Sequence, residues 1–172
     1  DVNIMAQEWL LHDYNDVSVE PDSEGLVAFY EFEGNANDSS GNALHGTLQG
    51  GAEIVPDSDP NRGQVREVEE GDPEHVVVAD DAKFSIADEI TLSAWVYPLD
   101  TTSWRTILSK FIGMRKDIYW FFYGGNLGVA LAGPQNENWR PYVPIETETW
   151  TYVAVTYDGS TMIMYKNGAD VA

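Results

Sequence analysis

The sequence contains no cysteine, few basic residues and no long apolar run. Without cysteine the chain has no disulfide, no thiol nucleophile and no thiolate metal site. Only 9 lysines and arginines face 29 aspartates and glutamates, so the net charge is −20 and nucleic acid or an anionic membrane is an unfavourable partner. This excess of carboxylates instead favours cations, above all calcium. No stretch approaches the roughly 20 apolar residues that span a bilayer.

The acidic residues are concentrated in the first half of the chain. Up to Glu89 there are 22 acidic and 3 basic residues, against 7 and 6 after it. A solvated acidic surface explains this distribution, and so does the convergence of some carboxylates on a metal. Because the first residue is Asp1 and no signal peptide is recognisable, we expect a processed product or an excerpt of a longer protein.

Helical periodicity is confined to the N-terminus. Apolar residues of VNIMAQEWLL recur at helical spacing, which predicts a short helix within residues 1–12. Residues 13–24 are rich in Asp, Asn, Ser and Pro without apolar periodicity, so we interpret them as a linker.

From Leu26 onward the apolar period is two, which predicts β-strands. Asp158-Gly159 and Asn167-Gly168 are expected hairpin turns. No helix long enough for a parallel crossover separates the strands, so we predict an all-β fold, an antiparallel two-sheet jelly-roll sandwich. The aromatic residues Trp95, Trp150, Tyr152 and Phe32 are expected in its core. The predicted strands are residues 26–33, 75–79, 90–97, 105–111, 117–123, 127–132, 150–157 and 161–166.

Five segments in a fixed order resemble the laminin-G-like, concanavalin-A-like jelly roll of bacterial secreted proteins. The most specific are ITLSAWVYP at 90–98 and WTYVAVTYDGSTMIMYKNG at 150–168, and the others lie at 25–51, 75–86 and 106–110. The resemblance implies that residues 25–172 form a non-catalytic, extracellular or cell-surface module for binding or adhesion. Family members continue past the Asn-Gly turn, so we expect this domain to be incomplete at its C-terminus. Residues 1–10 resemble the closing helix of a dockerin-type calcium repeat, although a plain amphipathic helix explains them equally well.

If these residues are the whole protein, the predicted strand 26–33 would be an unpaired sheet edge. Such an edge predicts a homo-oligomer formed by strand exchange.

The loop NANDSSGN at 35–42 is the best metal candidate. Asp38 would supply charge, Ser39 a backbone oxygen and Asn42 a neutral carbonyl, which suits the hard oxygen ligands of calcium. The family resemblance also implies a structural calcium site in this loop. The alternative is an Asx-turn that Asp38 closes on its own backbone.

Motifs for catalysis are missing. The acidic stretch EVEEGD at 67–72 lacks the alternating pattern that glycosidases on this fold use to pair two carboxylates. The three histidines are scattered, and there is no Gly-x-Ser-x-Gly motif. We therefore predict no catalytic residues and no enzyme.

Aromatic residues that fall in loops or at strand ends are the candidate ligand contacts. Sugar rings present apolar C–H faces that pack on aromatic rings, with nearby polar groups bonding the hydroxyls. We therefore expect a glycan, or else an extracellular protein, as the partner. The alternative is a structural self-assembly module whose partner is protein. The candidate residues are Trp104, Trp120, Tyr123, Trp139, Arg140 and Tyr142.

Overall fold

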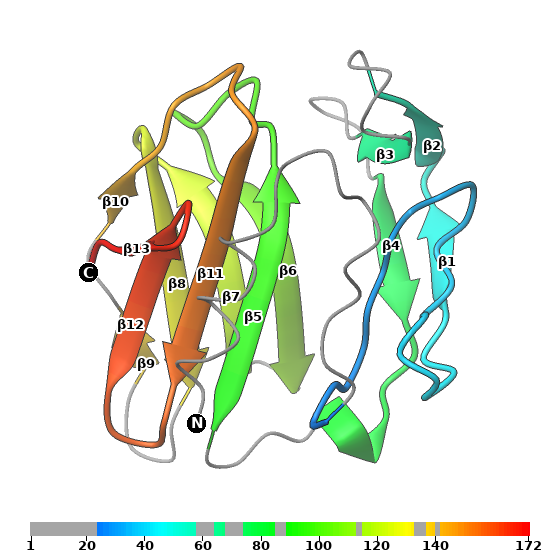
Figure 1. The fold of residues 1–172 in the computed structure, drawn as a ribbon, viewed down its shortest axis with the longest axis horizontal. Coiled ribbons are helices and arrows are strands. Elements are labelled where there is room, and N and C mark those ends of the chain that lie inside the picture. The colour runs from blue at the N-terminus through cyan, green and yellow to red at the C-terminus, as the bar shows by residue number, and fades with distance from the viewer. Residues whose placement is uncertain are drawn as a thin grey trace. The chain divides into compact units, whose positions relative to one another are not determined.

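The structure, a computed structural model, places the described residues in two compact units, one up to Ala87 and one from Asp88 onward (Figure 1). Each unit is described by itself. The described residues are 24–57, 64–67, 74–84, 89–112, 115–132, 137–139 and 142–172.

The second unit is a sandwich of two antiparallel sheets, seen one in front of the other in Figure 1. One sheet has the order β10-β8-β7-β6, with β9 also paired to β8. The other has the order β13-β12-β11-β5. The strands of the first sheet are β6 (Arg105–Ile112), β7 (Arg115–Tyr123), β8 (Asn126–Ala132), β9 (Glu137–Trp139) and β10 (Val143–Pro144). Those of the second are β5 (Ile90–Val96), β11 (Thr151–Tyr157), β12 (Met162–Lys166) and β13 (Ala169–Asp170).

The core lies between these sheets and follows from strand alternation, because successive side chains point to opposite faces. In β7 the even-numbered residues 118, 120 and 122 are buried in the core, and in β8 the odd-numbered residues 127, 129 and 131. The opposite sheet contributes Val153 and Val155 of β11 and Met162 and Met164 of β12. The predicted all-β, antiparallel sandwich is therefore confirmed.

Glycine determines the β7–β8 hairpin. Gly124 and Gly125 have φ values of 59° and 83°, and a two-residue turn with both central residues at positive φ matches the twist of the flanking strands. The predicted turn at Asn167-Gly168 is of the same kind, with φ values of 48° and 77°. The predicted two-residue turn at Asp158-Gly159 is wrong. Since Tyr157 pairs with Met162, the loop has four residues, and Asp158 Oδ1 accepts hydrogen bonds from the N–H groups of Ser160 and Thr161.

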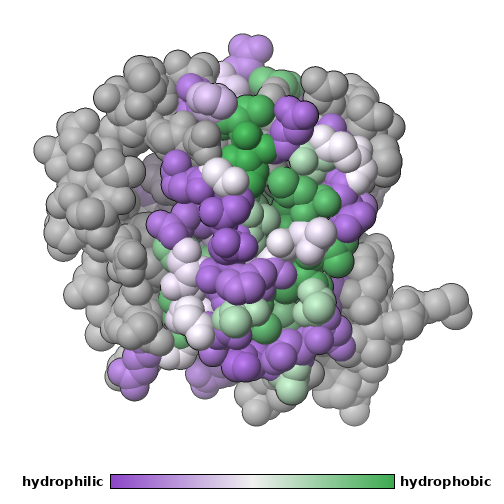
Figure 2. Space-filling view, turned by 90° about the vertical axis from the view of Figure 1, so that its right-hand side faces the viewer, coloured by the Kyte–Doolittle hydropathy of each residue, from purple (hydrophilic) through white to green (hydrophobic). Residues whose placement is uncertain are grey.

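The first unit contains two small antiparallel sheets. β1 (Gly46–Gln49) pairs with β4 (His75–Val78), and β2 (Glu53–Pro56) pairs with β3 (Gln64–Glu67). A short 3₁₀ turn, Ala82–Phe84, follows β4. Figure 2 looks at the side that carries these strands and shows apolar side chains beside hydrophilic ones. Leu48 and Val77 are the large apolar residues that the described part of this unit exposes most.

The predicted strand over residues 26–33 is wrong. Among the described residues, its one ladder contact is an isolated bridge from Tyr30 to Asp38. Phe32 has a φ of 59°, which ends the alternation that a strand needs. The backbone groups that a partner strand would use bond to loop side chains instead, since Phe29 N–H donates to Asp38 and the Asn42 amide donates to the carbonyl of Val27.

The other predicted strands are confirmed to within two residues at each end. The sequence reasoning missed β1, β2, β3, β9, β10 and β13, each of which has at most four residues. The predicted N-terminal helix, within residues 1–12, lies outside the described residues, and so does the predicted linker apart from Glu24. Within the described ranges, the chain has no helix with the length and hydropathy of a membrane span.

Candidate functional site: an aromatic face on the outer side of β7 and β8

The alternation that buries one side of β7 places an aromatic row on the other. Tyr119, Phe121 and Tyr123 point away from the core. Trp104, just before β6, and Tyr142, just before β10, contact the row from its two sides. We call these five residues the aromatic face.

Ring contacts hold the aromatic face together. Trp104 stacks on Tyr123 with centroids 4.3 Å apart and planes 20° apart, and it lies 4.6 Å from Phe121. Tyr119 stacks on Phe121 at 4.8 Å, and Tyr142 meets Phe121 edge-on at 6.2 Å. As a result Phe121 is completely buried although it faces outward, whereas Trp104 and Tyr142 remain 46% and 45% exposed. The cluster thus has a fixed apolar base and a solvent-accessible upper layer.

Glycine on the neighbouring strand makes room for this base. Gly128 of β8 is directly opposite Phe121 in the antiparallel register. A Cβ on Gly128 would lie 2.7 Å from the Phe121 ring and 3.2 Å from the Tyr142 ring. The next outward residue of β8 is Ala130, which is also small and is buried. These small residues leave room for the Phe121 and Tyr142 rings to approach β8 closely.

The loop that carries Trp104 is anchored by polar contacts. Asp100 accepts hydrogen bonds from the N–H and hydroxyl groups of Thr102 and forms an ion pair with Arg105 at 3.0 Å. The Thr102 hydroxyl and N–H, together with weaker contributions that include the charge of Arg105, lower the pKa of the Asp100 carboxyl. The carbonyls of Thr101 and Thr102 accept hydrogen bonds from Gly125 and Gly124. Trp104 is therefore held beside the β7–β8 turn.

Three of the predicted ligand-binding residues meet in this face, namely Trp104, Tyr123 and Tyr142. The prediction for Trp120 is corrected, because its side chain is 1% exposed and lies in the core on the opposite side of β7. The backbone of Trp139 pairs with Ala130. Arg140 lies outside the described residues.

The sequence reasoning missed two members of the face, Tyr119 and Phe121. The signal was available, because IYWFFY alternates two sides when it is read with period two. Aromatic residues fill both sides, so composition alone does not say which side is the core.

The predicted metal loop is organised around the carboxylate of Asp38, which is only 7% exposed. Its Oδ1 accepts hydrogen bonds from the N–H groups of Phe29 and Ser40, both at 2.9 Å. Its Oδ2 accepts from Leu44 N–H at 3.0 Å and from the Ser40 hydroxyl at 2.9 Å. The Asp38 N–H itself donates to His45 Nδ1 at 3.1 Å. This carboxylate therefore ties the start, middle and end of the loop together.

These donors determine the ionisation of Asp38. Burial by itself would raise the pKa of this carboxyl, but the N–H groups of Phe29, Ser40 and Leu44 and the Ser40 hydroxyl outweigh it and lower the pKa to about 2. Nearby, the Tyr30 hydroxyl donates to the carbonyl of Leu44 at 2.6 Å. Burial, reinforced by the charge of Asp38, raises the pKa of Tyr30 to about 12.

The bond from Ser40 N–H to Asp38 is the Asx-turn that the sequence offered as an alternative to calcium. The other predicted ligands, Ser39 and Asn42, also lie in this loop. The Ser39 hydroxyl donates to Glu31 Oε2, and the Asn42 amide donates to the carbonyls of Leu26 and Val27. Within the described residues, no three Asp, Glu or His side chains form a cluster suited to a metal ion. Calcium at this loop stays a prediction, and binding through Asp38 would have to replace hydrogen bonds already made.

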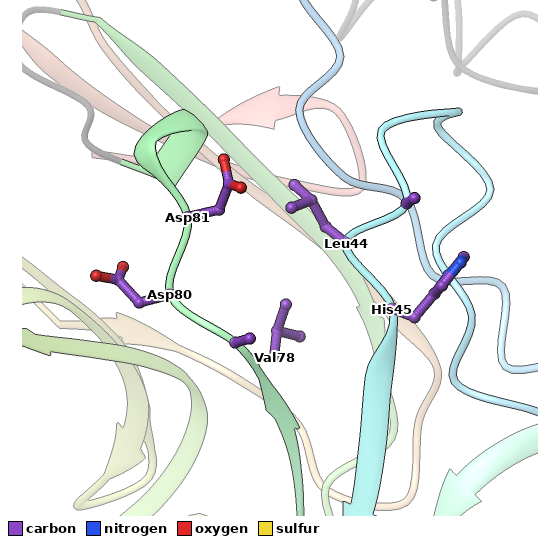
Figure 3. Close-up of a pocket in the computed structure, with 7 residues that line it drawn as sticks. Leu44, His45, Val78, Asp80 and Asp81 are labelled. Carbon is purple, nitrogen blue, oxygen red and sulfur yellow. The ribbon is translucent and has the colours of Figure 1, made fainter.

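A shallow pocket of about 170 Å³ lies near this loop, between Leu44, His45, Val78, Asp80 and Asp81 (Figure 3). Figure 3 shows the carboxylates of Asp80 and Asp81 pointing in different directions. Asp81 accepts a hydrogen bond from Lys83 N–H and lies 3.8 Å from the Lys83 ammonium. The pocket therefore has no converging pair of carboxylates.

The sandwich therefore presents an uncharged and partly exposed aromatic surface on the outer side of β7 and β8. Residues 70–172, more than half of the chain, match the laminin G model of the concanavalin A-like lectin/glucanases superfamily, and the chain belongs to that superfamily. The match includes β4 and the whole sandwich, whereas the loop around Asp38 lies before it. No match was found among curated proteins or among solved structures.

Proposed function

We propose that this protein is a non-catalytic, extracellular binding module that holds neutral glycans on the aromatic face. The observation that carries the proposal is the solvent-exposed layer of Trp104, Tyr123 and Tyr142 above the buried ring of Phe121. Sugar C–H faces pack on such rings, and three tyrosine hydroxyls lie in the same cluster to bond sugar hydroxyls. Membership of a superfamily of lectins and glucanases supports a carbohydrate ligand.

The charge of the chain supports a neutral ligand. With a net charge of −20, the protein repels acidic glycans, nucleic acid and anionic membranes at long range. None of the five residues of the aromatic face is charged, so attraction must come from ring packing and hydrogen bonds. We therefore expect affinity that changes little with salt, in contrast to ligands held by charge.

Binding without catalysis is also part of the proposal. A glycosidase needs two carboxyl groups about 5–9.5 Å apart on either side of the scissile bond. The residues that define the aromatic face include no acid. Glycans bound there are therefore expected to be released unchanged.

The test is a glycan array probed with the labelled protein. We expect binding to neutral glycans and none to polyuronates, and at least about tenfold weaker binding by Trp104→Ala and by Tyr142→Ala. Leu48→Ala is the matched control, because it removes an exposed apolar side chain of the other unit. Repeating the array with a chelator shows whether calcium takes part.

Two results would contradict the proposal. One is a wild-type array without any signal, and the other is binding that both aromatic substitutions leave unchanged. Release of reducing ends from a bound glycan would contradict only the non-catalytic part.

A further inference from the structure

A second group of aromatic residues lies on the outer side of the other sheet. Trp95 of β5 is directly opposite Tyr152 of β11, with ring centroids 5.4 Å apart. One step further along the strands, Tyr97 lies 5.5 Å from Trp150. We call these four residues the second strip. The alternation of their strands had predicted that Trp95, Trp150 and Tyr152 lie in the core.

Strand alternation explains why that expectation is wrong. In β11 the core residues are Val153 and Val155, so Tyr152 points outward, and its partner Trp95 points the same way. Trp95 is 47% exposed and Tyr97 is 41% exposed. Because the core separates the two sheets, the second strip and the aromatic face point away from each other.

The strand residues next to the second strip are small or carry hydroxyl groups. Toward the start of β5 the outward residues are Ser93 and Thr91, paired with Ala154 and Thr156 of β11. Ser93 forms a side-chain hydrogen bond with Tyr152, whose pKa is raised by burial. From Thr91 to Tyr97 this surface is about 20 Å long at the rise of an antiparallel strand, room for several sugar rings.

We propose that the second strip is a second binding site for neutral glycans, which makes the module bivalent. For its ligand class the inference rests on the proposed function. Half-exposed tryptophan and tyrosine rings beside hydroxyl groups suit the C–H faces and hydroxyls of sugars. A second copy of the chain is the competing occupant, and the dependence of the Trp95 signal on protein concentration distinguishes it from a glycan.

Bivalence has a physical consequence. A single glycan strand cannot lie on two outer faces separated by a core, so each module would join two glycan strands. Joining raises the apparent affinity for a dense polysaccharide without any new contact.

The experiment uses the full chain with 5-fluorotryptophan and follows ¹⁹F NMR signals during titration with neutral hexasaccharides of glucose, xylose and mannose. Single Trp→Phe variants assign the signals. Trp104 reports on the aromatic face, Trp95 and Trp150 report on the second strip, and buried Trp120 is the internal reference. We expect one hexasaccharide to shift the signals of both sites, with the Trp95 shift retained in Trp104→Ala and two sites per chain by calorimetry.

The variant Trp95→Ala/Tyr97→Ala should halve the number of sites and abolish cross-linking of a soluble neutral polysaccharide, measured as turbidity. Leu48→Ala is the control. A shift of Trp104 alone would overturn the inference and leave the proposed function standing. A shift of Trp95 alone would overturn both the aromatic face as the glycan site and bivalence, and it would assign the single glycan site to the second strip. No shift with any hexasaccharide would overturn both. A Trp95 signal that moves with protein concentration alone would assign the strip to self-association and overturn the second glycan site.

Discussion

Replacing Asp38 by asparagine tests whether this carboxylate holds the loop of the first unit together. An amide has one oxygen, so the NH₂ group of the variant must face a backbone N–H such as that of Leu44 or Phe29. An orphaned buried N–H costs about 1–3 kcal/mol, and the remaining bonds lose their charge assistance. We expect Asp38→Asn to lower the free energy of unfolding by about 3 kcal/mol at about pH 7.

The pH dependence has a definite sign. The pKa of Asp38 is lowered to about 2 in the folded protein from an ordinary value of 3.8. Its stabilisation is therefore complete above about pH 4 and is lost as the pH falls toward about 2, a change of about 2 kcal/mol. Protonated Asp38 resembles the amide, so the difference between wild type and Asp38→Asn should shrink by that amount over this range.

The assay is urea denaturation at several pH values, followed by far-UV circular dichroism. Hydrogen exchange at the amides of Phe29, Ser40 and Leu44 adds a local readout, since every tryptophan among the described residues lies in the sandwich unit. Asp80→Asn, which neutralises an exposed carboxylate of the same unit, is the control and should cost less than about 0.5 kcal/mol. A difference below about 1 kcal/mol for Asp38→Asn, or one independent of pH, would refute the reasoning.

Three further predictions concern the core, the aromatic face and calcium. Gly128→Ala should lower the unfolding free energy by about 1–3 kcal/mol, because the new Cβ would clash with the Phe121 ring. The double variant Gly128→Ala/Phe121→Leu should regain most of this loss, and additive losses in urea denaturation would contradict a clash between the two side chains. Trp120→Phe should change the unfolding free energy by less than about 1.5 kcal/mol, because the loss of ring volume is offset by removing a buried indole N–H that has no acceptor among the described residues. A loss of unfolding free energy above about 3 kcal/mol would show that this N–H has a hydrogen-bond acceptor. If calcium binds the loop at Asp38, it should raise the melting temperature of the wild type but not of Asp38→Ala. Superimposable melting curves with calcium and with chelator would contradict calcium binding at this loop.

Long strands could be predicted because their local pattern and their tertiary role agree. WTYVAVTY and ITLSAWV alternate cleanly, and they pair with each other as β11 and β5. The same alternation did not say which side faces the core. In β5 and β11 both sides carry large apolar residues, so Trp95 was assigned to the core although Val96 and Val153 occupy it. Burial depends on which sheet lies opposite, and that information is not local.

The stretch 26–33 shows the reverse case. Its composition is typical of a strand, but Asp38 and Asn42 take up its backbone groups and Phe32 adopts positive φ. A loop that bonds back to the chain 9 and 15 residues earlier cannot be seen in a local pattern. At the candidate site the exposed members Trp104, Tyr123 and Tyr142 were predictable because aromatics near turns stand out. The supporting residues Phe121 and Gly128 depend on cross-strand register, which only the structure provides.

Glycan binding on the aromatic face is tested most directly by isothermal titration of the wild type and of Trp104→Ala with the neutral hexasaccharide that binds best. We expect at least about tenfold weaker binding at the aromatic face in Trp104→Ala, partial recovery in Trp104→Phe, and wild-type affinity that is nearly the same in about 50 mM and about 500 mM NaCl. Equal affinities and equal site numbers for wild type and Trp104→Ala would contradict glycan binding on this face.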